Sequence, residues 1–282
     1  MISTLRANMN IPIKSHDLLW IAATVVVLYA TGVCLLCVNQ RRLLYPGSYS
    51  GKRYDNSTHN FKKTSLTAAD GIKLYAYTYL KKGNTKAIFL FHGNNDTAGR
   101  LLENAIANGY DKLGYDLYSI EYRGYDDIKP YRTTEQTLRA DVKALLPLMR
   151  QYQVSVIKAH SLGCFAATSL LKDFVPTTVI LEAPFWDIKS IAATHYRFMP
   201  GFMLDLVLKD RLENHANVTG VRLKKVLVVH SKIDRVIPFR FGKRLAEFMT
   251  ADDKELVPLA NSTHNGVLDD DGPIITSFLQ KL

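Results

Sequence analysis

The sequence has few cysteines and lacks the common metal and nucleotide motifs. Its three cysteines are Cys34, Cys37 and Cys164, and the first two lie inside an apolar run. Neither a disulfide framework nor a four-ligand zinc site is therefore predicted. No HExxH pattern, paired cysteines or carboxylate cluster points to a metal, and no glycine-rich phosphate loop points to a nucleotide. We expect a protein without a metal ion or another cofactor.

Negative charge is scarce, because 26 acidic residues stand against 36 lysines and arginines, which gives a formal net charge of +10. Such an excess indicates an anionic partner, either nucleic acid or a membrane surface. Several basic residues follow an apolar segment closely, namely Arg41, Arg42, Lys52, Arg53, Lys62 and Lys63. No basic helix, aromatic RNA-binding signature or zinc finger occurs. The distribution predicts a membrane surface as partner and no nucleic acid.

One long hydrophobic run, residues 18–38, carries no charge. Its length of about 21 residues is what a helix needs to cross ~30 Å of hydrocarbon. We predict a single transmembrane helix over 18–38, preceded by a tail over 1–17. A cleaved signal peptide is disfavoured because residues 39–42 are polar and basic and offer no small-residue cleavage site. A buried soluble helix is disfavoured because the run has no polar face.

The side of the membrane on which the rest of the chain lies stays open. Basic residues flank both ends of the apolar run, and their count slightly favours a C-terminal domain in the cytosol. Four glycosylation tripeptides begin at Asn56, Asn95, Asn217 and Asn261. They would matter only in a lumen, and such tripeptides often occur by chance.

Residues 39–60 are rich in polar, turn-forming residues and are predicted to form an exposed linker. The folded domain is expected over 61–282. It begins with two strand-like runs, 61–66 and 72–80, which are joined through Asp70-Gly71. Their alternation and the Asp-Gly turn predict an antiparallel hairpin.

The following stretch contains β-branched or aromatic runs that are mostly separated by segments with helical spacing. These runs are residues 86–93, 115–122, 154–161, 177–184 and 224–231. Such alternation predicts an α/β fold, with a mostly parallel central sheet and helices on both faces. One crossover helix is expected over 134–152, because its apolar residues fall on one face. The long connection over about 185–222 predicts a small helical cap.

Ser161 lies in the stretch AHSLG, where a predicted strand turns into a helix. A sharp strand-to-helix turn pushes the central side chain out of line, so the residues two before and two after it must be small. Ala159 and Gly163 meet this condition. The helix N-terminus also favours negative charge that develops near the serine. Ser161 is therefore the predicted nucleophile, and an ordinary helix-capping serine is the alternative.

A serine hydroxyl needs a base to take its proton and an acid to orient that base. Asp234 follows the strand-like run 224–231, and His264 follows a last strand-like run near 254–260. The chain order Ser161, Asp234, His264 is the order of one hydrolase class, distinct from the chymotrypsin and subtilisin orders. Asp187 also follows a strand and stays open as an alternative acid.

An oxyanion needs two backbone donors, one after the serine and one from the loop after the third strand. Leu162 and Asn94 fit these positions. His92 and His160 are expected to have structural roles near the serine.

Two further features near the predicted site are expected to have no catalytic role. The run 269–271 is predicted to be a solvated helix start. Cys164 is expected to fill space, with a redox-sensitive thiol as the alternative.

From about Gln40 to its C-terminus, the chain resembles the membrane-anchored α/β-hydrolases of the bud-emergence type, which are akin to serine aminopeptidases and monoglyceride lipases. The resemblance rests on the motifs QRRLLYPGS, LFHGNN, EYRGYDD, AHSLGC, LEAPF, VHSKIDRVIP and NSTHNGVL. The chain departs from the family pattern, which has glycine at the positions of Asp126, Ala159, Cys164 and Ser231.

The resemblance implies the α/β-hydrolase fold, with Ser161, Asp234 and His264 as nucleophile, acid and base. It also implies Asn94 and Leu162 as oxyanion donors and an anchor in an internal membrane such as the endoplasmic reticulum. Acyl esters or thioesters, in lipids or acylated proteins, are the implied substrates. Aromatic and methionine side chains of the cap are candidates for lining an acyl pocket, with ordinary packing as the alternative: Phe185, Trp186, Phe198, Met199, Phe202 and Met203.

The functional prediction is a single-pass membrane serine hydrolase. Two alternatives belong to other classes: an inactive membrane-tethered scaffold on a hydrolase fold, and a peptidase acting on small peptides. The acyl-chain preference and the oligomeric state stay open.

Overall fold

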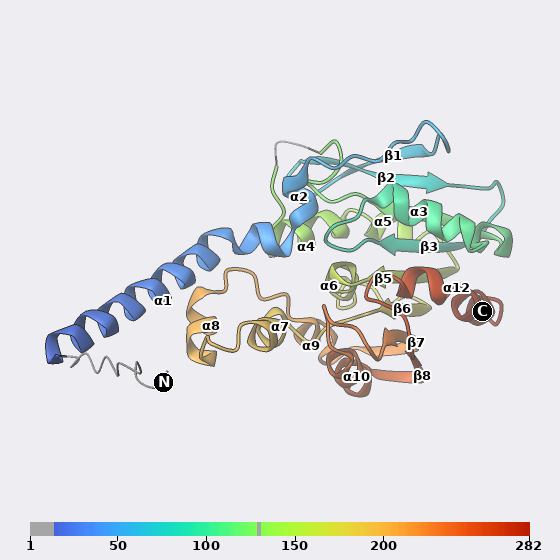
Figure 1. Ribbon diagram of the computed structural model, residues 1–282. Coiled ribbons are helices and arrows are strands. Elements are labelled where there is room, and N and C mark those ends of the chain that lie inside the picture. The colour runs from blue at the N-terminus through green and yellow to red at the C-terminus, as the bar shows by residue number, and fades with distance from the viewer. Residues whose placement is uncertain (1–13, 129–130) are drawn as a thin grey trace, which may run out of the picture. The chain divides into compact units, whose positions relative to one another are not determined.

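The computed structural model describes residues 14–128 and 131–282, and the chain divides into two compact units, residues 1–40 and 41–282. Helix α1, Ser15–Leu44, carries the predicted apolar run and extends beyond it at both ends (Figure 1). Among the described residues it is the one helix long and apolar enough to cross a membrane. Most of the predicted tail, residues 1–17, lies outside the described residues.

The segment predicted to be an exposed linker is partly folded, so that prediction is wrong for its first half. The chain is helical through Leu44, and a short helix α2 covers Pro46–Ser50. Tyr45 is fully buried in the core of the second unit, and Gly47 donates its N–H to the Asn94 carbonyl at 3.0 Å. These contacts, which no local pattern in the sequence signals, order the stretch.

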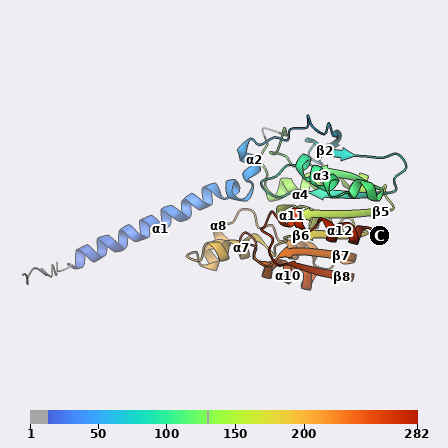
Figure 2. The same ribbon diagram turned by 45° about the vertical axis from the view of Figure 1, so that its right-hand side comes forward.

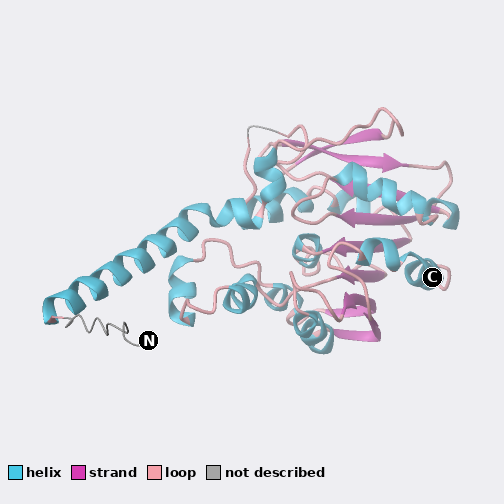
Figure 3. Cartoon of the chain, in the orientation of Figure 1, coloured by secondary structure: helices cyan, strands magenta, loops and turns pink. Residues whose placement is uncertain are grey.

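A twisted sheet of eight strands, counted over the described residues, forms the centre of the second unit (Figure 3). Its spatial order is β1-β2-β4-β3-β5-β6-β7-β8. The strands are β1 Lys62–Thr67, β2 Lys73–Tyr79, β3 Lys86–Phe91, β4 Tyr115–Ile120, β5 Val154–His160, β6 Thr178–Glu182, β7 Arg222–Ser231 and β8 Thr250–Leu259. The first two form the predicted antiparallel hairpin, and β3 to β8 pair in parallel.

Helices cover both faces of the sheet. One face packs against α3 Ala98–Ala107, α11 Val267–Asp270 and α12 Gly272–Leu279, with the 3-10 helix η1 Tyr110–Leu113 beside them. The other face packs against α4 Glu135–Lys143, α5 Leu146–Met149, α6 Leu162–Thr168, α9 Asn214–Val218 and α10 Phe239–Phe248. The central parallel strands are therefore buried on both sides, as their continuous apolar runs predict, whereas the edge strand β8 is largely exposed.

The crossover predicted as one helix over 134–152 is two helices, α4 and α5. Pro147 lies in the first turn of α5, where its missing N–H costs no hydrogen bond but where a continuous helix could not accommodate it. Thr134 begins α4 with a capping box, since its hydroxyl accepts the Thr137 N–H and the Thr137 hydroxyl accepts the Thr134 N–H. Leu138 and Met149 nevertheless face the core as predicted.

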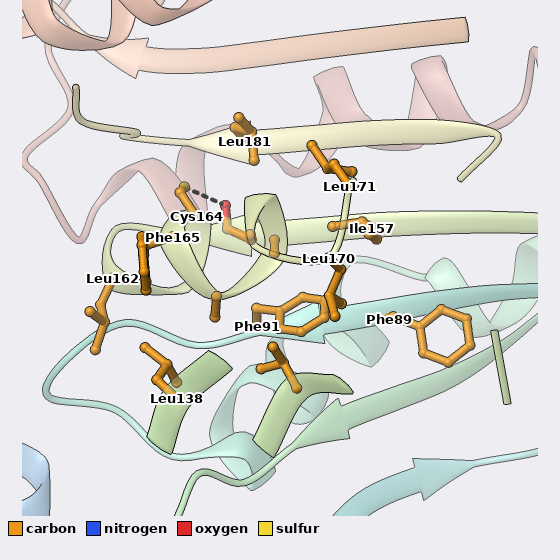
Figure 4. Packing of buried hydrophobic residues seen from close by; sticks show 14 of the residues in the cluster. Phe89, Phe91, Leu138, Ile157, Leu162, Cys164, Phe165, Leu170, Leu171 and Leu181 are labelled. Atoms are coloured by element: carbon orange, nitrogen blue, oxygen red, sulfur yellow. Dashed lines mark hydrogen bonds between the residues drawn. The ribbon is translucent and has the colours of Figure 1, made fainter. Parts of the chain in front are cut away.

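Helix α6 lies at the centre of the larger hydrophobic cluster. All seven of its residues, 162–168, are buried. Figure 4 shows Cys164 and Phe165 of α6 in the same cluster of buried side chains as Phe91, Ile157 and Leu181 of the strands. This packing fixes the start of α6, and with it the position of the preceding Ser161.

Between β6 and β7 the chain forms three short helices, α7 Ile188–His195, α8 Gly201–Val207 and α9. These helices fall within the stretch 185–222 for which a helical cap is predicted. Figure 2 labels α7 and α8 beside the β6 to β8 side of the sheet.

Candidate active site

Three side chains from three different loops meet at the carboxyl edge of the parallel sheet. Ser161 directly follows β5, Asp234 lies on the loop after β7, and His264 lies on the loop after β8. The Ser161 Oγ is 3.0 Å from Nε2 of His264, and Nδ1 of His264 is 2.6 Å from Oδ2 of Asp234. The carboxyl edge is where parallel sheets place their ligand sites.

The backbone at Ser161 is strained, with φ 53° and ψ −116°. A non-glycine residue at positive φ is uncommon and persists only where the surrounding structure enforces it. The enforcement comes from close packing: a Cβ added at Gly163 would lie 2.1 Å from the Phe91 carbonyl oxygen. Ala159 is fully buried between neighbouring strands. The small residues thus allow the tight turn that holds the hydroxyl out of the helix.

Asp234 is held as a carboxylate. Its Oδ1 accepts the N–H groups of Val236 and Ile237, both at 2.8 Å. Burial alone would raise the pKa of Asp234, but His230 and His264 beside the carboxylate outweigh it and hold this pKa below its usual range. A carboxylate in this state can orient the imidazole of His264 through its Nδ1–H.

The alternative acid, Asp187, has another use in the fold. It caps helix α7, where its Oδ1 accepts the Ser190 N–H at 2.6 Å. The nearest imidazole in an ion-pair contact with it is that of His215, at 3.9 Å. The carboxylate bonded to His264 is that of Asp234.

Leu162 and Asn94 flank the serine on two sides. Leu162 is the first residue of α6, and the first N–H groups of a helix have no intrahelical acceptor. The Asn94 carbonyl accepts the Tyr125 hydroxyl at 2.8 Å and the Gly47 N–H at 3.0 Å. Asn94 and Ser161 line one cavity of about 570 Å³. The predicted donor role of both N–H groups remains a proposal.

His92 lies under the loop that carries Asn94. Its Nδ1 donates to the Gly93 carbonyl at 2.8 Å, and its Nε2 lies 2.9 Å from Oε1 of Glu121. Glu121 also accepts the Ala98 N–H at 3.0 Å, at the start of α3. Because the Gly93 carbonyl and the Asn94 N–H belong to one trans peptide, fixing the carbonyl points the N–H to the opposite side. The structural role of His92 is predictable from the sequence, but its partner Glu121 is not.

His160 and Cys164 lie beside Ser161 but are not part of the chain of hydrogen bonds that joins Ser161, His264 and Asp234. Nε2 of His160 donates to the His264 carbonyl at 3.2 Å, which helps to hold that loop. Burial and the neighbouring His264 lower the pKa of His160 to about 4, so its imidazole is neutral at pH 7. Burial raises the pKa of the Cys164 thiol, which disfavours the redox-sensitive alternative.

A buried polar cluster below the site joins β5, β6 and the chain beyond His264. It consists of Lys158, Glu182 and Asp271, and the first two form an ion pair. Burial and the Glu182 carboxylate raise the pKa of Asp271 to about 10, so this acid is neutral at pH 7. The prediction of a solvated run over 269–271 is therefore wrong for Asp271, which is fully buried.

Two departures from the family pattern make specific contacts. Asp126, at φ 43°, accepts the hydroxyls of Tyr75 and Tyr77, both at 2.8 Å. Asp and Asn tolerate this left-handed backbone better than most residues. Ser231 donates its hydroxyl to the Ser262 carbonyl, which ties the acid loop to the loop of His264. Neither substitution disturbs the three aligned side chains.

The cavity above Ser161 is lined mostly by polar groups. Besides the serine it is bordered by Lys52, Asn95, Asp96, Arg100, Asn104, Val236, His264, Asn265 and Asp269, among others. Over residues 14–128 and 131–282, no group of three or more His, Cys, Asp or Glu side chains is placed to hold a metal ion.

Known proteins share parts of this chain. No model of a protein family matches the sequence. The lysophosphatidylserine lipase ABHD12 of Danio rerio is 30% identical over 187 residues, which cover 60% of this chain and 48% of that protein. The match therefore spans about half of that relative's length. An uncharacterized protein of Mycobacterium tuberculosis is 27% identical over 250 residues, which cover 86% of each chain.

The fold is also found in solved esterases. An esterase of Pyrococcus furiosus matches with a TM-score of 0.63 at 14% sequence identity, over 82% of this chain and 94% of that one. An esterase of Exiguobacterium antarcticum matches with a TM-score of 0.59 at 16% identity, over 78% of this chain and 100% of that one. These likenesses confirm the predicted fold class, the α/β-hydrolase fold.

Proposed function

We propose that this chain, a member of the α/β-hydrolase superfamily, is a membrane-anchored serine hydrolase that cleaves acyl esters or thioesters. Ser161 is the nucleophile, His264 the base and Asp234 the acid that orients the base. The observation that carries the proposal is the continuous row of contacts from the Ser161 Oγ to His264 and on to Asp234, at 3.0 and 2.6 Å.

The reaction follows from this geometry in two steps. The Ser161 Oγ attacks the acyl carbonyl carbon while Nε2 of His264 takes the hydroxyl proton. The negative oxygen lies between the N–H groups of Leu162 and Asn94, and the alcohol or thiol leaves with the proton from His264. Water then attacks the acyl-enzyme, gives a proton to His264, and releases the carboxylic acid and a free Ser161.

The peptide that presents the Asn94 N–H is held in place before any substrate binds. His92 fixes the Gly93 carbonyl from one side, and Tyr125 and Gly47 fix the Asn94 carbonyl from the other. A donor that needs no rearrangement stabilises the developing charge more strongly than a mobile one.

The substrate class rests on three supports. The curated relative from Danio rerio is a lipase for lysophosphatidylserine, a lipid ester with a polar head group. The cavity at Ser161 has a polar lining that suits a polar leaving group. Helix α1 has the length and composition of a membrane span, which would hold the chain beside acyl lipids and acylated proteins.

Three finer parts of the proposal rest on the resemblance of sequence motifs to a known family. They are membership in the bud-emergence branch, a single-pass signal anchor and a location in an internal membrane. The inactive-scaffold alternative is disfavoured because dead relatives usually lose a member of the triad, and here all three side chains are in contact. A peptidase would prefer aminoacyl amides to acyl esters.

The test is hydrolysis of a panel of defined acyl esters, acyl thioesters and aminoacyl amides by the full chain in detergent micelles. We expect acyl esters or thioesters to turn over, and Ser161→Ala to lower kcat/KM by at least about a thousandfold, as loss of a triad nucleophile does. Equal turnover by both proteins would assign the activity to a contaminant or to another site. Preference for the amides would favour the peptidase.

A further inference from the structure

Helix α8 carries two large apolar side chains that face solvent within the second unit. Phe202 is 66% exposed and Leu206 is 81% exposed. They lie four residues apart and therefore on one face of the helix, whereas Leu204, between them, points inward and is 1% exposed. A folded domain gains nothing from exposing such residues together, so this face is suited to an apolar partner.

The contacts on the C-terminal side of α8 connect it to Arg41, the first residue of the second unit. Arg41 follows the apolar run, and its Nε donates to Oδ2 of Asp210 at 2.9 Å. Asp210 comes shortly after the end of α8 at Val207, and its Oδ1 accepts the Glu135 N–H at 3.0 Å. The Asp210 side chain is 3% exposed, so this tie belongs to the folded unit.

The contacts on the N-terminal side connect α8 to the candidate active site. His195 ends α7, and its Nε2 donates to the Val236 carbonyl at 2.9 Å. Val236 lines the cavity above Ser161. Helix α8 (Figure 1) therefore lies on the segment that runs from the rim of the cavity to the residue bonded by Arg41.

The charges beside α8 suit the surface of an anionic bilayer. The exposed basic residues Arg197, Lys209 and Arg211 flank the helix on both sides. The acidic residue within it, Asp205, is bonded to Lys189 at 2.6 Å, which neutralises its charge. Apolar side chains with basic flanks are the composition of segments that insert at the head-group boundary of a membrane.

We propose that the exposed face of α8, with Phe202 and Leu206, inserts into the head-group region of the same bilayer that holds α1. This inference rests on the membrane anchoring in the proposed function. Insertion would bring the cap and the rim of the cavity to the lipid surface, so that an acyl substrate could pass from the bilayer to Ser161 without crossing water.

The test is photo-crosslinking of the full chain in vesicles of phosphatidylcholine and phosphatidylserine that contain a phospholipid with a diazirine on its acyl chain. Adducts are mapped by mass spectrometry. We expect adducts within residues 18–38, from the anchor, and at residues 202 and 206. Val175 is the apolar control and should carry none. It is 44% exposed and precedes β6, so it lies at the amino ends of the strands, opposite the carboxyl edge where Ser161 lies.

Adducts in the anchor but not in α8 overturn the inference and leave the membrane anchoring intact. In that case something other than lipid, such as a second copy of the chain, covers α8. Absence of adducts from both segments overturns the anchoring as well. Catalysis is not needed for this readout, so the chemistry at Ser161 is tested separately.

A paired variant tests the consequence for substrate supply. Phe202→Ser with Leu206→Ser should lower the rate on a long-chain acyl ester in vesicles, relative to the rate on a soluble short-chain ester, by at least about tenfold, the scale of losing even one of the two buried apolar side chains. Val175→Ser should leave this ratio at the wild-type value. An unchanged ratio in the paired variant would contradict the inference.

Discussion

Below Ser161, the proposed nucleophile, buried ionisable side chains support the strands that end beside it. Lys158 lies on β5, which ends directly before Ser161, and Glu182 is the last residue of the neighbouring strand β6. The backbone carbonyl of Glu182 accepts the Ser161 N–H at 2.9 Å. Asp271 joins them as a neutral acid, because burial and the adjacent Glu182 raise its pKa. Because Asp271 is neutral, the Glu182 carboxylate of the buried ion pair does not face a second negative charge.

This arrangement predicts different outcomes for two matched amide substitutions. Glu182→Gln leaves the buried Lys158 ammonium without its carboxylate and should destabilise the domain by about 3–5 kcal/mol. A loss of that size corresponds to a fall of roughly 10 °C in Tm for a domain of this size. Asp271→Asn replaces a neutral acid with a neutral amide and should change Tm by much less. Thermal unfolding of both variants in detergent at pH 7 makes the comparison.

Equal melting of the two variants, or a larger loss for Asp271→Asn, would mean that Asp271 carries the charge. At this scale the sequence marks the groups that we propose to react but not those that support them. Ser161, Asp234 and His264 each follow a strand and can be found by position. Glu121, Glu182 and Asp271 act through partners distant in the chain, and no local spacing marks such partners.

At the scale of elements, the turn between β5 and α6 can form only because Gly163 has no side chain. Gly163 lies against the backbone of β3, where a Cβ would meet the Phe91 carbonyl oxygen at 2.1 Å. Neither partner can yield easily, because Phe91 is paired within the sheet and α6 is buried along its length. The turn therefore couples the position of Ser161, the proposed nucleophile, to the packing of the sheet.

Gly163→Ala should consequently move α6 and Ser161 away from His264. We expect kcat/KM to fall by at least about tenfold and the free energy of unfolding to fall by about 1–3 kcal/mol, the usual cost of overpacking. Ala159→Gly, which removes volume from the other side of Ser161, is the control and should retain most of the activity. Ester hydrolysis and thermal unfolding distinguish the two variants, and wild-type behaviour of Gly163→Ala would contradict this role of the turn.

Most elements could be predicted because parallel strands and crossover helices follow strong local patterns. The hairpin, the parallel strands and the covering helices on both faces are observed where expected. The break between α4 and α5 was visible in Pro147, but the amphipathic pattern on both sides of it favours a continuous helix. The folding of Tyr45 and α2 onto the second unit could not be predicted, because it depends on contacts with Asn94 and the distant core.

At the scale of the whole molecule, one chain carries a candidate membrane span and an α/β-hydrolase unit. The fold class follows from the order of strands and helices, and likeness to solved esterases supports it. Substrate identity does not follow from the fold, because the same scaffold serves many reactions. It depends on the cavity at Ser161 and on how the cap meets the surface from which substrate arrives.

The central claim is that His264 activates Ser161, and labelling by a fluorophosphonate probe tests it most directly. The full chain, its Ser161→Ala variant and its His264→Ala variant are treated in detergent beside a known serine hydrolase, and the modified residue is mapped by mass spectrometry. We expect a single adduct at Ser161 in the wild type, none in Ser161→Ala, and a strongly reduced labelling rate in His264→Ala. A wild-type protein that stays unlabelled while the known hydrolase reacts, or that is labelled at another residue, would contradict the claim.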